Sequence, residues 1–220
     1  SRAARAVFQE ADDILGVRLS KLIFQGPSRK LQDTVNSQPA IMTVSIAAWK
    51  AWEEFTGSEL EPPAALAGHS LGEYTSMVVA GVVSFADGVT LVRQRGRLMQ
   101  QASKGRPGGM AAILGLDELA ASQICSETGV ELANINSDDQ IVISGDKIAV
   151  AQAMDLASAR GARKTIPLTV SGAFHSSLMQ AAKEGLSEAL VSMDFQDPVA
   201  PIIANSDCAE LRTGEQVREE

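Results

Sequence analysis

The pentapeptide GHSLG at residues 68–72 carries the clearest chemistry in the chain. It has the G-x-S-x-G spacing of a nucleophile elbow, in which a serine stands at the apex of a tight turn between a strand and a helix. Residues 64–67 form a short apolar run that predicts a buried strand, and residues 73–80 predict a helix. At the start of that helix, Ser70 could attack a carbonyl carbon while the backbone N–H of Leu71 faces the developing oxyanion.

A serine at such a turn needs neighbours without bulk on both sides, which Gly68 and Gly72 supply. A nucleophilic serine also needs a base within hydrogen-bond reach, and the chain has two histidines. His69 precedes Ser70, and adjacent residues at a sharp turn point apart, which favours a structural role for His69. His175 lies in a Gly/Ser-rich loop before a predicted helix and is the better candidate for the base, with a surface loop histidine as the alternative.

Arg95 is the third residue that could take part in chemistry. Residues 84–102 predict a helix that opens with a capping box, and Arg95 falls about 60° from the centre of its apolar stripe. A guanidinium at the flank of a buried face needs an anionic partner, because an unpaired buried charge is destabilising. The pattern leaves two partners open: a neighbouring Asp or Glu in a structural salt bridge, or a substrate carboxylate held bidentately.

The elements that precede the elbow are predominantly helical. Residues 2–15 predict an amphipathic helix, and residues 17–30 predict a short loop-rich segment. A second helix is predicted to begin at Pro39, which suits a first helical position. Its apolar stripe includes Trp52 and Phe55, which we expect in the core.

A segment rich in glycine, KGRPGG at residues 104–109, marks a boundary after the arginine-bearing helix. The residues that follow predict the order β-α-β-β-α-β, which is the split βαβ or ferredoxin-like arrangement. We therefore predict an α/β protein whose large subdomain, residues 1–105, returns at residues 171–220 after a small subdomain inserted at residues 106–170.

Few strands remain for the sheet of the large subdomain. Outside the insert only residues 64–67 and 201–204 predict strands, and two strands do not make a stable sheet covered on both faces. This shortage predicts that sequence before residue 1 and after residue 220 is missing.

Composition narrows the class of protein. The 220 residues are 45% hydrophobic and 21% charged, the balance of an ordinary soluble globular protein. A net charge of −8 argues against nucleic acid as the main partner. No apolar run has the length of a membrane span, and no secretory signal opens the chain. Cys125 and Cys208 lack the spacing of a metal site or a disulfide framework, so we interpret them as reduced thiols in a cytoplasmic protein.

Together these motifs resemble the malonyl-CoA:acyl carrier protein transacylases of fatty-acid and polyketide synthesis. The resemblance rests on GHSLGE at residues 68–73, QRG at 94–96 and GAFHS at 172–176, with QPA at 38–40 and N-x-N-S at 134–137 in the same order. It spans nearly the whole chain. It implies an α/β-hydrolase-like large subdomain with an inserted ferredoxin-like small subdomain, in agreement with the order of predicted elements.

The resemblance also implies a catalytic or substrate-binding role for six residues. They are Ser70 as nucleophile, His175 as base, Arg95 as the malonate-binding arginine, Leu71 as an oxyanion donor, and Phe174 and Asn136 as further substrate-binding residues. The implied reaction passes a malonyl group from malonyl-CoA to the serine and then to the phosphopantetheine thiol of acyl carrier protein. Neither a metal nor a cofactor of the enzyme itself is implied. The bulk of Phe174 is expected to crowd an α-methyl group, so methylmalonyl-CoA should be a poor substrate.

Two family segments are absent from the 220 residues: an N-terminal Gly-Gln-Gly-Ser-Gln loop that supplies a second oxyanion contact, and a C-terminal segment that orients the histidine. We expect that a protein limited to these residues would be unstable or nearly inactive. The family resemblance fits either a monomer or a domain of a larger synthase.

Two other functions remain open on the residues alone. One is a serine esterase or thioesterase, whose histidine would need an orienting acid between Ser70 and His175 in the sequence, and none of the five aspartates of the insert is singled out. The other is a non-catalytic carrier-docking domain, with Arg160, Arg163 and Lys164 as a basic patch for an acidic carrier.

Overall fold

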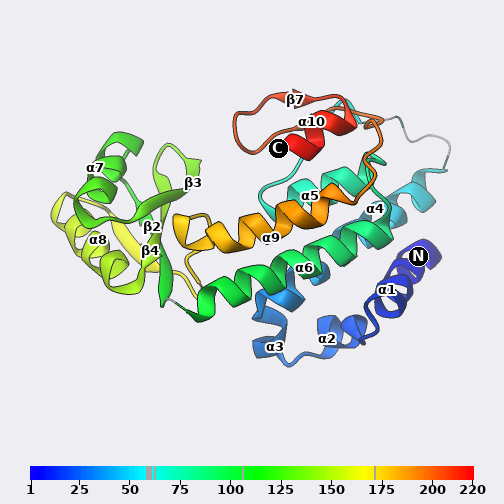
Figure 1. The fold of residues 1–220 in the computed structure, drawn as a ribbon, viewed down its shortest axis with the longest axis horizontal. Coiled ribbons are helices and arrows are strands. Elements are labelled where there is room, and N and C mark those ends of the chain that lie inside the picture. Colours follow the sequence, from blue (N-terminus) through cyan, green and yellow to red (C-terminus); the bar gives the residue numbers. More distant parts are fainter. Residues whose placement is uncertain (58–60, 62, 106, 171) are drawn as a thin grey trace. The chain divides into compact units, whose positions relative to one another are not determined.

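The computed structural model describes all of the chain except residues 58–60, 62, 106 and 171 (Figure 1). Helices and two small sheets make up the structure, so the predicted α/β class is confirmed. No helix among the described residues is both long enough and apolar enough to cross a membrane.

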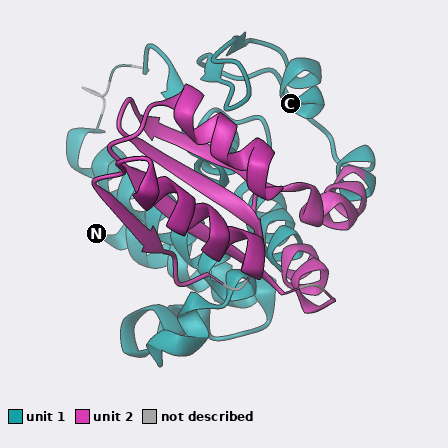
Figure 2. Ribbon diagram, turned by 90° about the vertical axis from the view of Figure 1, so that its left-hand side faces the viewer, with its two compact units in different colours: residues 1–96, 188–220 teal, residues 97–187 magenta. Residues whose placement is uncertain are grey.

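The chain divides into two compact units (Figure 2). The first comprises residues 1–96 and 188–220, and the second comprises residues 97–187. These limits fall within two helices, α6 (Phe85–Lys104) and α9 (Gln180–Val191), whereas the subdomain limits predicted from the sequence fall at residues 106 and 171, which lie outside the described residues. The predicted limits of 1–105, 106–170 and 171–220 stay a prediction.

The first unit begins with four helices. They are α1 (Arg2–Leu15), α2 (Leu19–Gln25), α3 (Ser28–Gln32) and α4 (Thr34–Thr56). The prediction for α1 is confirmed, and the helix ends at Gly16 with a positive φ of 62°. The expectation of a loop-rich segment over residues 17–30 is wrong, because α2 and most of α3 lie there. Helix α4 begins five residues earlier than predicted, so Pro39 lies inside it, where it cannot supply an N–H to the helical ladder.

The buried face of α4 also differs from the predicted one. The side chains of Trp52 and Phe55 are 52% and 86% exposed, so their expected place in the core is wrong. Met42 and Ile46 instead pack in a cluster with Val7 of α1. The helix carries apolar residues on more than one side, and packing against α1 and the elbow helix decided which side is buried.

The sheet of the first unit has three very short strands. They are β1 (Leu66–Ala67), β6 (Ile202–Ile203) and β7 (Glu210–Leu211), in the order β1-β6-β7. Strand β1 runs parallel to β6, and β7 runs antiparallel to it. The prediction of two strands is therefore corrected to three. β1 is also shorter and less buried than expected, because it lies at the edge of this sheet.

Helices complete the first unit around this sheet. Helix α5 (Leu71–Val79) follows β1, the first part of α6 follows α5, and α10 (Gly214–Glu219) ends the chain. A core cluster joins α5 to the sheet and to α10, with Met77, Ile202, Leu211 and Val217 among its buried members. This packing fixes the turn between β1 and α5 against the carboxyl end of β6.

The second unit contains the predicted β-α-β-β-α-β order. Its elements are β2 (Gly108–Leu114), α7 (Glu118–Thr128), β3 (Glu131–Ser137), β4 (Gln140–Asp146), α8 (Lys147–Ala159) and β5 (Lys164–Pro167). The strands form one antiparallel sheet in the order β3-β4-β2-β5, so the ferredoxin-like prediction is confirmed. Alternate residues of β2 face opposite sides of the sheet. Ala111 and Ile113 pack with residues of α7 and α8, which cover one face (Figure 2).

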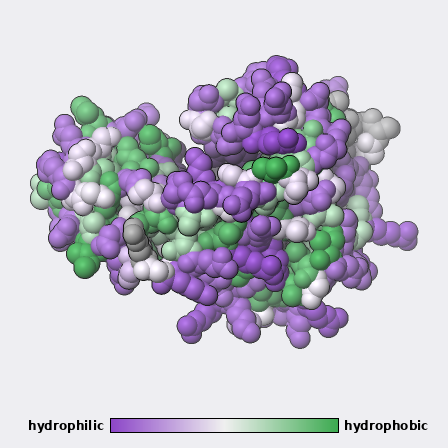
Figure 3. Space-filling model, viewed as in Figure 1, coloured by the Kyte–Doolittle hydropathy of each residue, from purple (hydrophilic) through white to green (hydrophobic). Residues whose placement is uncertain are grey.

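Hydrophilic and hydrophobic residues are interspersed over the face of the molecule that Figure 3 shows. Such mixing is typical of globular proteins, in which apolar atoms still contribute about half of the accessible surface.

Candidate active site

Ser70 stands in a strained backbone conformation at the turn between β1 and α5. Its φ is 51° and its ψ is −104°, and it precedes the first residue of the helix. A positive φ in a residue other than glycine carries a free-energy cost of about 1–3 kcal/mol and clusters at functional sites. The strand, sharp turn and helix together give the geometry of a nucleophile elbow.

Only one of the two elbow glycines is required by space. A Cβ atom on Gly68 would lie 2.1 Å from the backbone carbon and oxygen of Gly72, closer than any real contact. A Cβ atom on Gly72 would meet nothing within 4 Å. The prediction that both positions must lack a side chain is therefore wrong for Gly72, because a Cβ atom there would point into open space.

Asn205 binds the elbow from the loop that follows the neighbouring strand, two residues after the end of β6. Its side-chain Oδ1 accepts the Ser70 N–H at 2.7 Å, and its Nδ2 donates to the Gly68 carbonyl oxygen at 2.5 Å. Its backbone N–H donates to Glu73 Oε1 at 3.0 Å. Asn205 is not among the site residues predicted from the sequence. The available signal was its place at the carboxyl end of a buried strand, where ligands and catalytic groups of α/β sheets gather.

Arg95 lies beside the serine and holds two neutral acceptors. Its Nη2 donates to Ser70 Oγ at 3.1 Å, and its Nη1 donates to Gln38 Oε1 at 2.7 Å. The guanidinium carbon also lies 5.3 Å from the centre of the Tyr74 ring, a cation–π distance. No salt bridge within the described part of the chain includes Arg95. The structural salt bridge left open by the sequence is therefore not formed among these residues.

Close packing of α6 on α4 brings Arg95 to Gln38. A Cβ atom on Gly96 would lie 2.6 Å from the Thr34 carbonyl oxygen, so the two helices touch through backbone atoms at this point. Gln38 is buried, and its Nε2 donates to Thr34 Oγ1 at 2.8 Å. That bond leaves the Gln38 carbonyl oxygen facing Arg95 and fixes the direction of the guanidinium.

Burial perturbs two ionisable groups of this site. Burial raises the pKa of Tyr74, and the nearby positive charge of Arg95 opposes the change. Burial also raises the pKa of Glu73, while the hydrogen bond from the Asn205 N–H acts in the opposite direction. The carboxylate of Glu220 adds to the increase. A glutamate with a raised pKa destabilises the folded state once it is ionised.

We expect Glu73→Gln to stabilise the protein more at neutral pH than at acidic pH. Below the ordinary glutamate pKa of about 4.3, the wild-type carboxyl is neutral in both the folded and unfolded states. As the pH rises through the raised folded-state pKa, the unfolded state loses its proton first, so the wild-type protein loses stability. Melting temperatures of both proteins across this range test the expectation, and a difference that does not change with pH would contradict it.

His175 lies in a tight turn of the second unit. Its φ is 58°, so it too is a residue other than glycine with a positive φ. Ala173 before it is buried, and Phe174 packs against the cluster of Met110, Ala112 and Val142 on the sheet face opposite α7 and α8. The turn thus rests on the ferredoxin-like sheet and presents the imidazole at the surface of this unit.

Hydrogen bonds on the far side of the turn hold it in place. Ser176 Oγ donates to the Ala173 carbonyl oxygen at 2.7 Å. The N–H and hydroxyl of Ser177 both donate to Glu131 Oε1, at 2.9 Å and 2.7 Å. These contacts anchor the histidine turn to the start of β3.

Residues 1–218 match the family model of the acyl transferase domain. The chain belongs to this family. It is 47% identical over 208 residues to the malonyl CoA-acyl carrier protein transacylase of Bacillus subtilis strain 168, covering 92% of this chain and 64% of that protein. It therefore spans just under two thirds of the length of that relative.

Solved structures show the same fold. An acyl carrier protein S-malonyltransferase from Vibrio cholerae has a TM-score of 0.93 and 38% identity, covering 100% of this chain and 72% of that one. A malonyl-transacylase in complex with its type II PKS acyl-carrier protein has a TM-score of 0.95 and 38% identity, covering 100% and 71%. The predicted family resemblance is confirmed.

The acyl transferase domain presents one further backbone donor at the elbow. The N–H groups of Ser70, Gly72 and Glu73 have acceptors, namely Asn205 Oδ1, the His69 carbonyl oxygen at 2.8 Å and the Ser70 carbonyl oxygen at 3.2 Å. Leu71 is the first residue of α5, where a helix offers no internal acceptor for the N–H. Its side chain is buried in the core, which holds that N–H in place.

Asn136, the remaining predicted site residue, lies on β3 in the second unit. It is exposed, and its Nδ2 donates to Gln140 Oε1 at 3.1 Å across the β3–β4 hairpin. Ser70, Leu71 and Arg95 are thus brought together in the first unit. His175, Phe174 and Asn136 belong to the second, and their predicted roles stay predictions.

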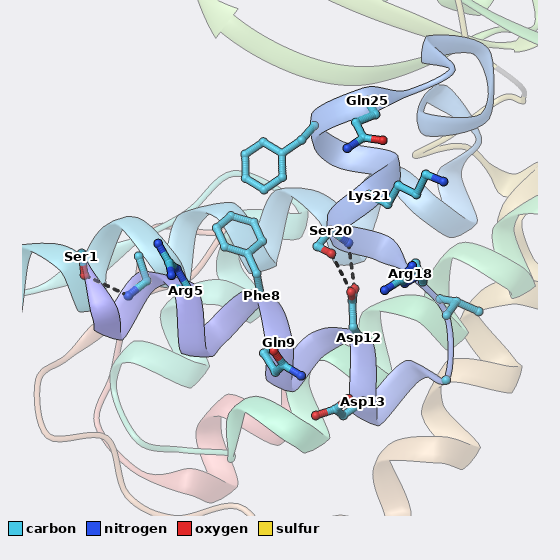
Figure 4. A pocket seen from close by; sticks show the side chains of 14 residues that line it. Ser1, Arg5, Phe8, Gln9, Asp12, Asp13, Arg18, Ser20, Lys21 and Gln25 are labelled. Carbon is cyan, nitrogen blue, oxygen red and sulfur yellow. Dashed lines mark hydrogen bonds between the residues drawn. The ribbon is translucent and has the colours of Figure 1, made fainter.

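A separate surface cavity of about 930 Å³ lies between α1 and α2 (Figure 4). Arg5, Arg18 and Lys21 line it, together with Asp12, which accepts hydrogen bonds from the N–H and hydroxyl of Ser20 at 2.8 Å and 2.6 Å. None of the predicted site residues lines this cavity, so volume alone does not locate the chemistry.

Proposed function

We propose that this acyl transferase domain moves a malonyl group from malonyl-CoA to the phosphopantetheine thiol of an acyl carrier protein, through a malonyl ester on Ser70. The observation that carries the proposal is Arg95 Nη2 at 3.1 Å from Ser70 Oγ, where the guanidinium forms no salt bridge with a residue that the structure describes. A guanidinium beside a nucleophile is suited to hold the free carboxylate of a malonyl group while its thioester carbonyl lies at the serine. The names of the relatives support the same reaction.

The reaction proceeds in two balanced halves. Ser70 gives its proton to His175 as its Oγ bonds to the thioester carbonyl carbon, and the C–S bond then breaks so that CoA leaves with that proton. In the second half the carrier thiol gives a proton to His175 as its sulfur bonds to the ester carbonyl carbon. The ester C–O bond then breaks, and Ser70 Oγ takes that proton back from His175 to regain its hydroxyl. The Leu71 N–H and the positive end of α5 stabilise the oxyanion in both halves.

The second unit supplies the remaining proposed contacts. We assign Phe174 to selection against an α-methyl substituent and Asn136 to substrate binding, as the family resemblance implies. Malonyl-CoA is the donor, and phosphopantetheine arrives on the partner, so we propose no cofactor of the domain itself. We also propose a cytoplasmic location, which suits the free thiols of Cys125 and Cys208.

Two observations weigh against the other functions left open by the sequence. Arg95 beside the nucleophile favours a substrate with a free carboxylate, which a general esterase does not require. The basic patch of a docking module is partly neutralised, because Arg160 pairs with Glu127 at 2.7 Å and Arg163 pairs with Asp139 at 2.9 Å. An acyl carrier protein is still proposed as the partner, because a relative has been solved in complex with one.

Intact-mass analysis of the full-length protein mixed with malonyl-CoA tests the proposal. We expect the wild-type protein to gain one malonyl group and the Ser70→Ala variant to gain none, with transfer to a carrier protein reduced by about 10³-fold or more. A malonyl adduct that persists in Ser70→Ala would refute the nucleophile. Carrier binding by a wild-type protein that never forms the adduct would favour the docking module instead.

A further inference from the structure

We propose that Asn205 is a positioning residue that holds Ser70 in its reactive conformation. This inference rests on the proposed role of Ser70 as nucleophile. Asn205 makes hydrogen bonds to three residues of the elbow: its side chain binds Gly68 and Ser70, and its backbone N–H binds Glu73. It lies 135 residues away in sequence from Ser70, so the contact depends on the tertiary fold.

The two side-chain hydrogen bonds of Asn205 help to maintain the strained backbone conformation of Ser70. The peptide units on either side of a residue with φ of 51° and ψ of −104° must be held in orientations that the chain does not prefer. Asn205 Oδ1 accepts the Ser70 N–H and so holds the peptide unit that precedes Ser70. Nδ2 of the same side-chain amide donates to the Gly68 carbonyl oxygen, one peptide unit earlier. An amide can do both at any pH, because it carries one acceptor and one donor side by side, whereas an ionised carboxylate only accepts.

The third hydrogen bond of Asn205 connects the loop after β6 to helix α5. The backbone N–H of Asn205 donates to Glu73, which lies in the first turn of α5. Since β6 runs parallel to β1, the carboxyl ends of both strands meet at this point. The loop after β6 therefore fixes both the turn and the helix that begins there.

The hydrogen bond between the Ser70 N–H and Asn205 Oδ1 also indicates which backbone N–H faces the oxyanion. Asn205 Oδ1 occupies the N–H of Ser70, so that N–H is not available to a bound carbonyl oxygen. The elbow then offers its Leu71 N–H to the substrate. Loss of the Asn205 side chain would remove the acceptor of the Ser70 N–H. The N–H groups of Ser70 and Leu71 could then both turn towards the carbonyl oxygen of the substrate, and the turn would no longer be held in one orientation.

Asn205 is exposed, so its replacement creates no buried cavity. We expect Asn205→Ala to lower both the rate of malonyl-serine formation and the rate of Ser70 labelling by a fluorophosphonate by about 10²-fold, the usual effect of a misplaced reacting group. The KM for malonyl-CoA should change by less than about threefold, because Arg95 and Gln38 are untouched. Ser206→Ala is the matched control: it removes a hydrogen bond to Glu220 in the same loop and should leave both rates unchanged.

Asn205→Asp supplies a readout that a general loss of structure would not produce. Its neutral carboxyl can accept from Ser70 and donate to Gly68, whereas its ionised form only accepts and faces a carbonyl oxygen. Among the described residues, Glu73 on α5 accepts from its backbone N–H, and the charged groups that act on Glu73 in turn are Glu220, the C-cap of α10, and Arg95 on α6. The nearby carboxylates of Glu73 and Glu220 favour the neutral form of an aspartate at this position. We therefore expect labelling relative to wild type to be about tenfold lower at about pH 8 and to recover towards about pH 5, as the carboxyl becomes protonated. Asn205→Ala should show no such recovery.

The two probes separate this inference from the proposed function. If wild-type Ser70 reacts with the fluorophosphonate but never accepts a malonyl group, the proposed substrate is wrong, and the labelling rates of the variants still decide the role of Asn205. Labelling of Asn205→Ala at the wild-type rate would overturn the inference. So would a wild-type Ser70 that does not react with the probe, or an Asn205→Asp profile parallel to that of wild type.

Discussion

Arg95→Ala should lower kcat/KM for malonyl-CoA about 10³-fold, because two charge-assisted hydrogen bonds to a carboxylate contribute about 4 kcal/mol together. The same substitution should change kcat/KM for acetyl-CoA by less than about tenfold, since acetyl-CoA has no free carboxylate. Steady-state kinetics with both thioesters measure the ratio. The effect is specific because the side chain lies beside Ser70 Oγ rather than in a salt bridge to a described residue.

Arg95→Lys is the matched control for charge. Lysine keeps the positive charge but loses the planar fork that reaches two acceptors at once, so we expect a loss between those of the wild type and of the alanine variant. Equal losses for malonyl-CoA and acetyl-CoA in Arg95→Ala would contradict carboxylate recognition. That result would instead indicate that the guanidinium acts on Ser70 or Gln38 alone.

Gly68→Ala should destabilise the protein by about 3 kcal/mol and slow fluorophosphonate labelling of Ser70 by more than about 10²-fold. The added methyl group would lie 2.1 Å from backbone atoms of Gly72, so the turn must open. Because the clash is with backbone, no side-chain rotation can relieve it. Chemical denaturation and labelling rates of the purified variant give both quantities.

Gly72→Ala is the control within the same turn. A methyl group there meets nothing within 4 Å, and the position lies in α5. Alanine in a helix is more stable than glycine by about 0.5–1 kcal/mol, so we expect a small gain in unfolding free energy. A comparable destabilisation in both variants would show that the elbow does not depend on contact between Gly68 and Gly72.

The second unit could be predicted from the sequence almost element by element. Each of β2, β3 and β4 is seven residues long, enough for apolar alternation and turn residues to mark it. Strand β7, by contrast, has two residues, Glu210 and Leu211, and no apolar run marks it as β1 and β6 are marked. The sequence therefore predicted the inserted subdomain better than the sheet beside the elbow.

The site divides along similar lines. The elbow was predictable because its spacing is local, and Arg95 was placed on the flank of a buried face by helical periodicity. Asn205 was not predictable, because its bond to Ser70 spans 135 residues and leaves no local pattern. The exposed face of α4 was assigned wrongly for the same reason: the choice between two apolar stripes depends on which helices pack against them.

The positive φ of Ser70 lowers the stability of the fold at the residue whose hydroxyl is needed for the reaction. A glycine there would adopt the same backbone without strain, so selection for a more stable fold alone would replace the serine. Persistence of serine in this conformation would then reflect selection on chemistry. Substitutions meant to stabilise this domain are best placed away from Ser70 and from the loop that carries Asn205, because there they should raise the free energy of unfolding without lowering the turnover rate.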